Sequence, residues 1–141
     1  MLTFLGKGAM DDAHPNFLGQ LGRLGSKASM EAIEKTDLII MIGAEYPFGR
    51  DYFNQNVKSV QINTDPVTLG KRLPSTLGIL GDSKAVMRDL INAGEAIPAN
   101  NWLKANQMNR KNWLDWIHTF EDSNETPMRP EPIMKALNEH A

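Results

Sequence analysis

Short apolar runs alternate with amphipathic segments over the first two thirds of the chain. The run LIIMI at Leu38–Ile42 is unbroken, which predicts a strand covered on both faces, as in a parallel sheet. Residues 59–63 (SVQIN) and Leu77–Leu80 (LGIL) predict two more strands. A short run at residues 2–5 ends at a glycine and predicts a further one.

Helical patterns separate these strands. Residues 26–35 predict a helix that begins at a serine, either Ser26 or Ser29. Residues 82–94 predict a second, with an apolar stripe and a final Gly94 as its stop. Strands that alternate with helices indicate an open α/β sheet.

Composition changes at Gly94. All 11 glycines lie at or before this residue, and all 3 tryptophans lie after it. We therefore expect an α/β domain over residues 1–94 and a connector over residues 95–132, with a tryptophan-rich amphipathic helix at residues 101–120 and a linker. Residues 133–141 predict the start of another helix and domain.

Composition also narrows the class of protein. The net charge of −2 and pI of about 5.9 give no basic stripe, so a nucleic-acid partner is not expected. The chain has no cysteine, which excludes disulfides and thiolate metal sites and is typical of a cytoplasmic protein. No apolar run approaches the roughly 20 residues of a membrane span, and the first residues do not resemble a signal peptide.

The strand ends are the expected place for a ligand. In an open parallel sheet, ligands bind beyond the carboxyl ends of the strands, where glycine permits close backbone approach. The residues at these ends are Lys7 and Gly8; Gly43, Ala44 and Glu45; Asn63 and Asp65; Gly81 and Asp82. They suit a nucleotide-like ligand, although any α/β fold ends its strands in such loops. Tyr46, Pro47 and Phe48 would either wall a planar ligand or cap the core.

Motifs of catalysis are absent from the sequence. The segment GKG at residues 6–8 lacks the spacing of a phosphate-binding P-loop, and the glycines of residues 19–25 follow no strand. The histidines share no metal-ligand spacing. No residue set forms a complete catalytic site.

Four segments together resemble a known family. GKGAMDDAHPNFLG (residues 6–19), TDLIIMIGAEYPFG (36–49), VQINTDPVTLGKR (60–72) and GDS (81–83) look like the central domain of thiamine diphosphate-dependent enzymes. The YPF and LGKR segments resemble the pyruvate oxidase branch, whose central domain holds FAD. The resemblance covers nearly the whole chain.

The resemblance implies a Rossmann-like parallel sheet, truncated here at its N-terminal side. It implies flavin-side contacts at Lys7, Gly8 and residues 43–48, and adenosine-side contacts at Asn63, Asp65, Gly81 and Asp82. The family usually has aspartate where this chain has Asn63, which lacks the charge.

The implied whole enzyme decarboxylates pyruvate oxidatively, with thiamine diphosphate, Mg and FAD. The thiamine and magnesium sites belong to the N- and C-terminal domains, which are this chain's expected partners, so we expect no catalytic residue here and no activity alone. A homo-oligomer is also expected, and a quinone-linked enzyme would be peripheral to the membrane. Two alternatives stay open: an acetolactate synthase or 2-oxo acid decarboxylase, and a free-standing nucleotide-binding or interaction module.

Overall fold

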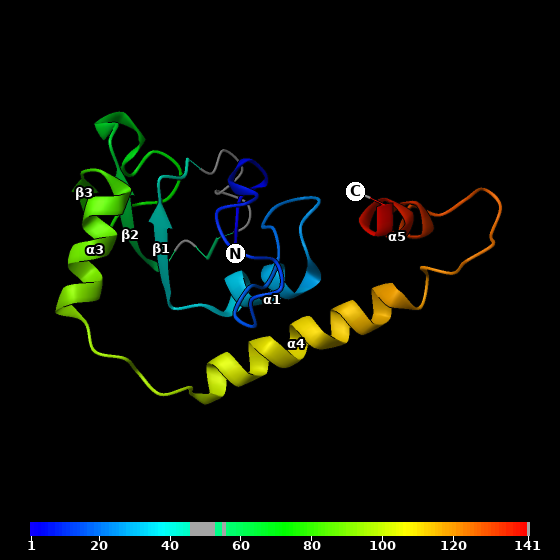
Figure 1. The fold of residues 1–141 in the computed structure, drawn as a ribbon. Coiled ribbons are helices and arrows are strands. Elements are labelled where there is room, and N and C mark those ends of the chain that lie inside the picture. Colours follow the sequence, from blue (N-terminus) through cyan, green and yellow to red (C-terminus); the bar gives the residue numbers. More distant parts are fainter. Residues whose placement is uncertain (46–52, 55, 141) are drawn as a thin grey trace.

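A parallel sheet organises the α/β part of the chain. The computed structural model describes residues 1–45, 53–54 and 56–140. Its sheet has the strand order β1-β2-β3, formed by Leu38–Ile42, Lys58–Asn63 and Leu77–Leu80 (Figure 1). The predictions of an α/β class and of these three strands are confirmed.

One face of the sheet carries the core. Ile39 of β1 is buried with Ile33 of helix α1 (Lys27–Lys35), together with Phe53, Val57 and Leu73. Helix α1 begins where predicted, because the Ser26 hydroxyl accepts a hydrogen bond from the Ser29 amide at 3.1 Å.

The other face of β1 is open. Leu38, Ile40 and Ile42 are 46%, 53% and 40% exposed, so the prediction that β1 is covered on both faces is wrong for this structure. Helix α3 (Ser83–Ala93) contacts β2. The unbroken apolar sequence of β1 makes both of its faces suitable for burial. It does not determine whether a helix packs on each face.

The predicted strand at residues 2–5 is also wrong. Leu2 forms only an isolated parallel bridge with Gln20, and the next residues form a 3-10 helix, Phe4–Gly6. The Thr3 hydroxyl accepts a hydrogen bond from the Gly6 amide at 3.2 Å. This cap turns the chain before a ladder can extend.

Two further helices follow the sheet. Helix α4 (Asn101–His118) contacts α1, and helix α5 (Pro130–His140) lies beyond a turn (Figure 1). Arg129 fixes that turn because its guanidinium lies 3.9 Å from the Phe120 ring centre and bonds the Glu131 carboxylate. Both helices lie close to where the sequence predicted them.

Candidate functional site

The ends of the three strands meet at one edge of the sheet. The Gly43 amide after β1 donates to the Ile62 carbonyl at 2.8 Å, and the Gly81 amide after β3 donates to the Asn63 carbonyl at 2.9 Å. These bonds continue the ladder one step beyond the strands and hold the three loops side by side.

Gly43 brings the end of β1 close to the start of α3. Its φ of +59° is in the left-handed region that favours glycine. A Cβ there would lie 3.3 Å from the Ser83 hydroxyl. Asp82 caps α3 by accepting a hydrogen bond from the Ala85 amide at 3.0 Å, so its first role is structural.

Asn63 and Asp65 build the turn after β2. The side-chain oxygen of Asn63 accepts from the Asp65 amide at 3.0 Å, and one Asp65 carboxylate oxygen accepts from the Val67 amide at 2.9 Å. The second bond begins a 3-10 helix, Pro66–Thr68. These turns do not use the Asn63 amide nitrogen or the second Asp65 oxygen, which leaves one donor and one acceptor for a ligand.

Glu45 is paired with the turn that follows this 3-10 helix. One of its carboxylate oxygens lies 2.8 Å from the Lys71 Nζ and 3.4 Å from an Arg72 Nη. The hydrogen bond from Lys71 lowers the pKa of Glu45, and the charges of Lys71 and Arg72 add to that effect against partial desolvation. The end of β1 and the turn after β2 are therefore linked by charge.

The buried side chain of Gln61 holds the same turn by hydrogen bonds to its backbone at Gly70 and Leu73. The Gln61 carboxamide accepts from the Gly70 amide at 2.8 Å and donates to the Leu73 carbonyl at 2.8 Å and to the Ser59 hydroxyl at 3.1 Å. Ser59 in turn donates to the Pro74 carbonyl at 2.8 Å. Gln61 and Ser59 are 5% and 0% exposed. The polar face of β2 thus fixes the backbone on both sides of Lys71 and Arg72.

Lys7 and Gly8 lie in the N-terminal turn, where the structure forms no strand. Lys7 forms an ion pair with Asp12 in the N-terminal turn. Gly8 has a φ of +91° and open space where a Cβ would stand. The sequence placed Lys7 and Gly8 at the end of a strand. Residues 2–5 do not form that strand, so there is no strand end at this position. Ala44 lies between Gly43 and Glu45 at the edge, and Tyr46, Pro47 and Phe48 lie outside the described residues.

An apolar groove lies next to Glu45. It has a volume of about 690 Å³, and its walls come from the N-terminal turn and from the loop before α1: Thr3, Phe4, Leu5 and residues 20–25, with Glu45 at the sheet edge. Phe4, Leu5 and Leu24 are strongly exposed. A mostly apolar groove of this size with two charged side chains, Arg23 and Glu45, is typical of small-molecule sites.

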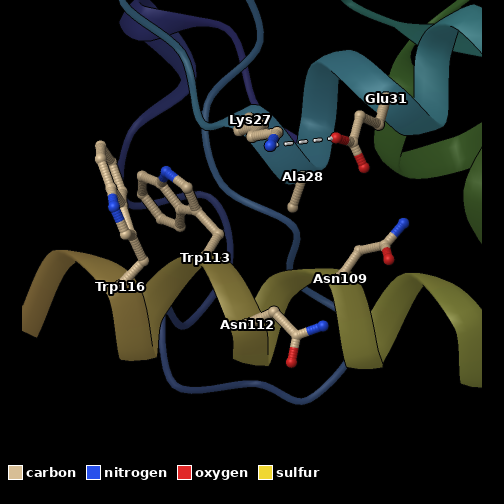
Figure 2. Close-up of a pocket in the computed structure, with 7 residues that line it drawn as sticks. All are labelled: Lys27, Ala28, Glu31, Asn109, Asn112, Trp113 and Trp116. Carbon is tan, nitrogen blue, oxygen red and sulfur yellow. Dashed lines mark ion pairs between the residues drawn. The ribbon is translucent and has the colours of Figure 1, made fainter.

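A second cleft lies between α1 and α4, with a volume of about 320 Å³. Figure 2 shows Trp113 and Trp116 rising from α4 toward Lys27, which is paired with Glu31 at 3.7 Å. Asn112 points away from α1 (Figure 2). This cleft is the seam between two helices and lies apart from the strand ends.

Lys71, Arg72 and Gln61 were missed by sequence reasoning. The basic pair resembles an ordinary solvated surface. Gln61 did leave a signal, because Ser59 and Gln61 share the face of β2 opposite Val60 and Ile62. Two polar residues on a strand face that enters the core must find hydrogen bonds.

The described residues place no three metal-ligating side chains together, and no helix among them has the length and hydropathy to cross a bilayer. The edge offers a ligand backbone amides, the Asn63 amide nitrogen, carboxylate oxygens and two cations.

Comparison with known proteins defines the class. The family model for the thiamine pyrophosphate enzyme, central domain, matches residues 1–90. The chain belongs to this family, and its α/β sheet is the family's central domain.

Relatives span the whole chain. The Bacillus subtilis protein YdaP, named as thiamine pyrophosphate-containing, is 36% identical over 141 residues, all of this chain and 24% of that protein. The pyruvate oxidase of Lactiplantibacillus plantarum is 29% identical over 143 residues, again 100% of this chain and 24% of the relative. An acetolactate synthase large subunit assigned in Methanocaldococcus jannaschii is 30% identical over 148 residues, 97% of this chain and 24% of the relative. The chain thus spans about a quarter of the length of these relatives.

Proposed function

We propose that this chain supplies part of the FAD-binding central domain of a pyruvate oxidase-like enzyme. The observation that carries the proposal is the meeting of the three strand ends at one edge, where backbone hydrogen bonds from Gly43 and Gly81 hold the loops side by side. The similarity to a pyruvate oxidase over the whole chain supports it. The whole enzyme would decarboxylate pyruvate oxidatively with thiamine diphosphate and Mg bound in other domains.

The residues at the edge fit a dinucleotide such as FAD. The unused Asn63 amide nitrogen and Asp65 carboxylate oxygen suit the hydroxyl groups of a ribose. The apolar groove beside Glu45 suits a planar ring. Bound FAD would accept electrons from the substrate, while this chain would orient it and shield its ring from water.

Catalysis would depend on other parts of the enzyme. The sheet edge holds cations, carboxylates and amides, and the described residues include no group of three side chains that could hold a metal ion. We infer that the chain alone does not turn over pyruvate. We also infer that it works in the cytoplasm and that its partners are the N- and C-terminal thiamine-binding domains within a homo-oligomer. The exposed Leu38, Ile40 and Ile42 offer apolar surface for such partners.

The direct test is thermal unfolding of the chain by circular dichroism, with and without excess FAD. A ligand that binds only the folded state raises the melting temperature, so we expect FAD to raise it and thiamine diphosphate to leave it unchanged. A cooperative melt that FAD does not shift would refute FAD binding by this chain. Pyruvate oxidation by the chain itself would refute the absence of catalysis.

An acetolactate synthase is the second candidate, because the relatives include acetolactate synthases of similar identity. FAD binding by this chain is expected for both. The two candidates differ in the whole enzyme, where pyruvate should bleach the flavin absorbance of an oxidase under anaerobic conditions and leave that of a synthase unchanged.

A further inference from the structure

Helix α4 holds the N-terminal segment through one arginine. The Arg110 guanidinium donates to the Asp12 carbonyl at 2.6 Å and to the His14 carbonyl at 3.2 Å, across 98 and 96 positions of sequence. On the same side of α4, Gln107 donates to the side-chain oxygen of Asn16 at 2.9 Å. We propose that Arg110 is a positioning residue for the apolar groove, because it fixes the turn from which both groove walls continue. That a ligand occupies the groove rests on the proposed function, whereas the contacts of Arg110 do not.

The turn that Arg110 holds, residues 11–17, is compact. The His14 amide donates to the Asp11 carbonyl at 3.1 Å, and the Phe17 amide donates to the His14 carbonyl at 2.9 Å. Phe17 closes the turn and is 4% exposed. Because these residues are bonded to one another, a guanidinium that fixes two of their carbonyls fixes the position of the whole turn.

Both groove walls are tied to this turn. On its N-terminal side, the Asp12 carboxylate pairs with Lys7, which directly follows the 3-10 helix of the first wall. On its C-terminal side, the chain returns to Leu2. The Leu2 amide donates to the Gly19 carbonyl at 3.2 Å, and the Leu2 carbonyl accepts from the Leu21 amide at 2.8 Å. The second wall begins at the next residue after Gly19, so a shift of the turn would move the two walls.

The walls have little packing of their own. Phe4, Leu5 and Leu24 line the groove and are 79%, 95% and 94% exposed. A segment with few buried apolar contacts opens at a low cost in free energy, so its position depends on the hydrogen bonds that tie it to the rest of the chain. Arg110 suits this role, because the planar guanidinium presents its donors in a fixed geometry and can bind two carbonyls at once.

A role in overall stability alone would give a different result from a role in positioning. If Arg110 only stabilised the fold, its loss would speed amide hydrogen exchange throughout the chain, including at Gly43, whose amide donates to the Ile62 carbonyl at 2.8 Å in the sheet. If Arg110 positions the groove walls, its loss should speed exchange at Leu2 and Leu21 and leave Gly43 unchanged.

The test is amide hydrogen exchange of the ¹⁵N-labelled chain, followed by NMR. Arg110→Met keeps most of the side-chain length and removes both bonds, and we expect Leu2 and Leu21 to exchange about fivefold faster. Arg110→Lys keeps one charged donor and should lie between Arg110→Met and the unchanged chain. Lys111→Met is the matched control, because Lys111 is the neighbouring exposed cation and pairs with Asp115 of α4 itself, at 2.5 Å; it should match the unchanged chain.

Titration of the same samples with FAD connects the walls to binding. We expect Arg110→Met to bind FAD several-fold more weakly and Lys111→Met to bind it as the unchanged chain does. Exchange at Leu2 and Leu21 that is unaffected in Arg110→Met, or that rises equally at Gly43, would overturn the proposal, as would equal FAD affinity in Arg110→Met and the unchanged chain. Failure of the unchanged chain to bind FAD would instead refute the proposed function, and the exchange result alone would then decide the role of Arg110.

Discussion

Gln61 is the residue whose replacement tests the architecture of the site most sharply. We predict that Gln61→Met destabilises the chain strongly while keeping the strand in place. Methionine has nearly the same length and shape and is easily accommodated in a core. The change therefore removes hydrogen bonds without opening a large cavity.

The magnitude follows from the groups that lose their partners. Gln61 bonds the Gly70 amide, the Leu73 carbonyl and the Ser59 hydroxyl, at 2.8, 2.8 and 3.1 Å. Ser59 keeps its bond to the Pro74 carbonyl, so two backbone groups are left unsatisfied. A buried group that loses its partner costs about 1–3 kcal/mol, which gives a loss of about 2–4 kcal/mol after the gain from the apolar side chain is subtracted.

Urea unfolding followed by circular dichroism measures this change. The matched control is Gln107→Met on α4, where a half-buried glutamine makes an exposed hydrogen bond, donating to Asn16 at 2.9 Å. Exposed polar contacts contribute little, so the control should change stability by less than about 0.5 kcal/mol. If Gln61→Met and Gln107→Met lowered the free energy of unfolding by the same small amount, the buried hydrogen bonds of Gln61 would not be what holds the turn.

Two more predictions concern the sheet edge. Gly43→Ala should cost about 1–2 kcal/mol in the same urea experiment, because a φ of +59° is strained for alanine and the new Cβ would lie 3.3 Å from the Ser83 hydroxyl. If Gly43→Ala left stability unchanged, neither the left-handed backbone nor the contact to Ser83 would matter. The hydrogen bond from Lys71 lowers the pKa of Glu45 in the folded chain, so the ion pair stabilises the fold fully above the ordinary glutamate pKa, and that stability is lost as pH falls through the lowered folded pKa. The acid-induced loss of stability should therefore be smaller in Glu45→Gln, and an unchanged pH dependence would show that the pair with Lys71 does not form in solution.

The sequence predicted much of the fold because its signals are local. Ser26, one of the two serines expected to begin α1, caps it, and α3 lies within the predicted residues 82–94. The strand at Leu38–Ile42 is placed correctly. The wrong predictions concern features that depend on contacts between segments far apart in the sequence. The run at residues 2–5 has the composition of a strand, but a ladder needs a partner along its length, and the structure gives Leu2 only a single bridge to Gln20.

The site was predictable only in outline. Parallel strands bring their carboxyl ends to one edge, so Gly43, Asn63 and Gly81 could be grouped from the sequence alone. The pairing of Glu45 with Lys71 spans 26 positions of sequence and depends on the turn that Gln61 holds. No local sequence pattern predicts the pairing of Glu45 with Lys71, because it depends on how the backbone between them folds.

Asn63 offers a final test, because the structure shows which of its atoms is already occupied. Its side-chain oxygen accepts the Asp65 amide at 3.0 Å, so the group with no hydrogen bond in this turn is the amide nitrogen, which donates. Aspartate at this position would keep the turn and replace the donor with an acceptor.

We therefore predict that Asn63→Asp folds with unchanged stability and binds FAD several-fold more tightly, since a ribose hydroxyl donates well to a carboxylate. Asn63→Ala should lose about 1 kcal/mol of stability with the turn. Thermal unfolding with and without FAD measures both quantities on the same samples. Weaker FAD binding by Asn63→Asp would mean that the amide nitrogen, or the absence of a charge near Asp65, is what the ligand requires, and the ribose would then have to lie elsewhere along the edge.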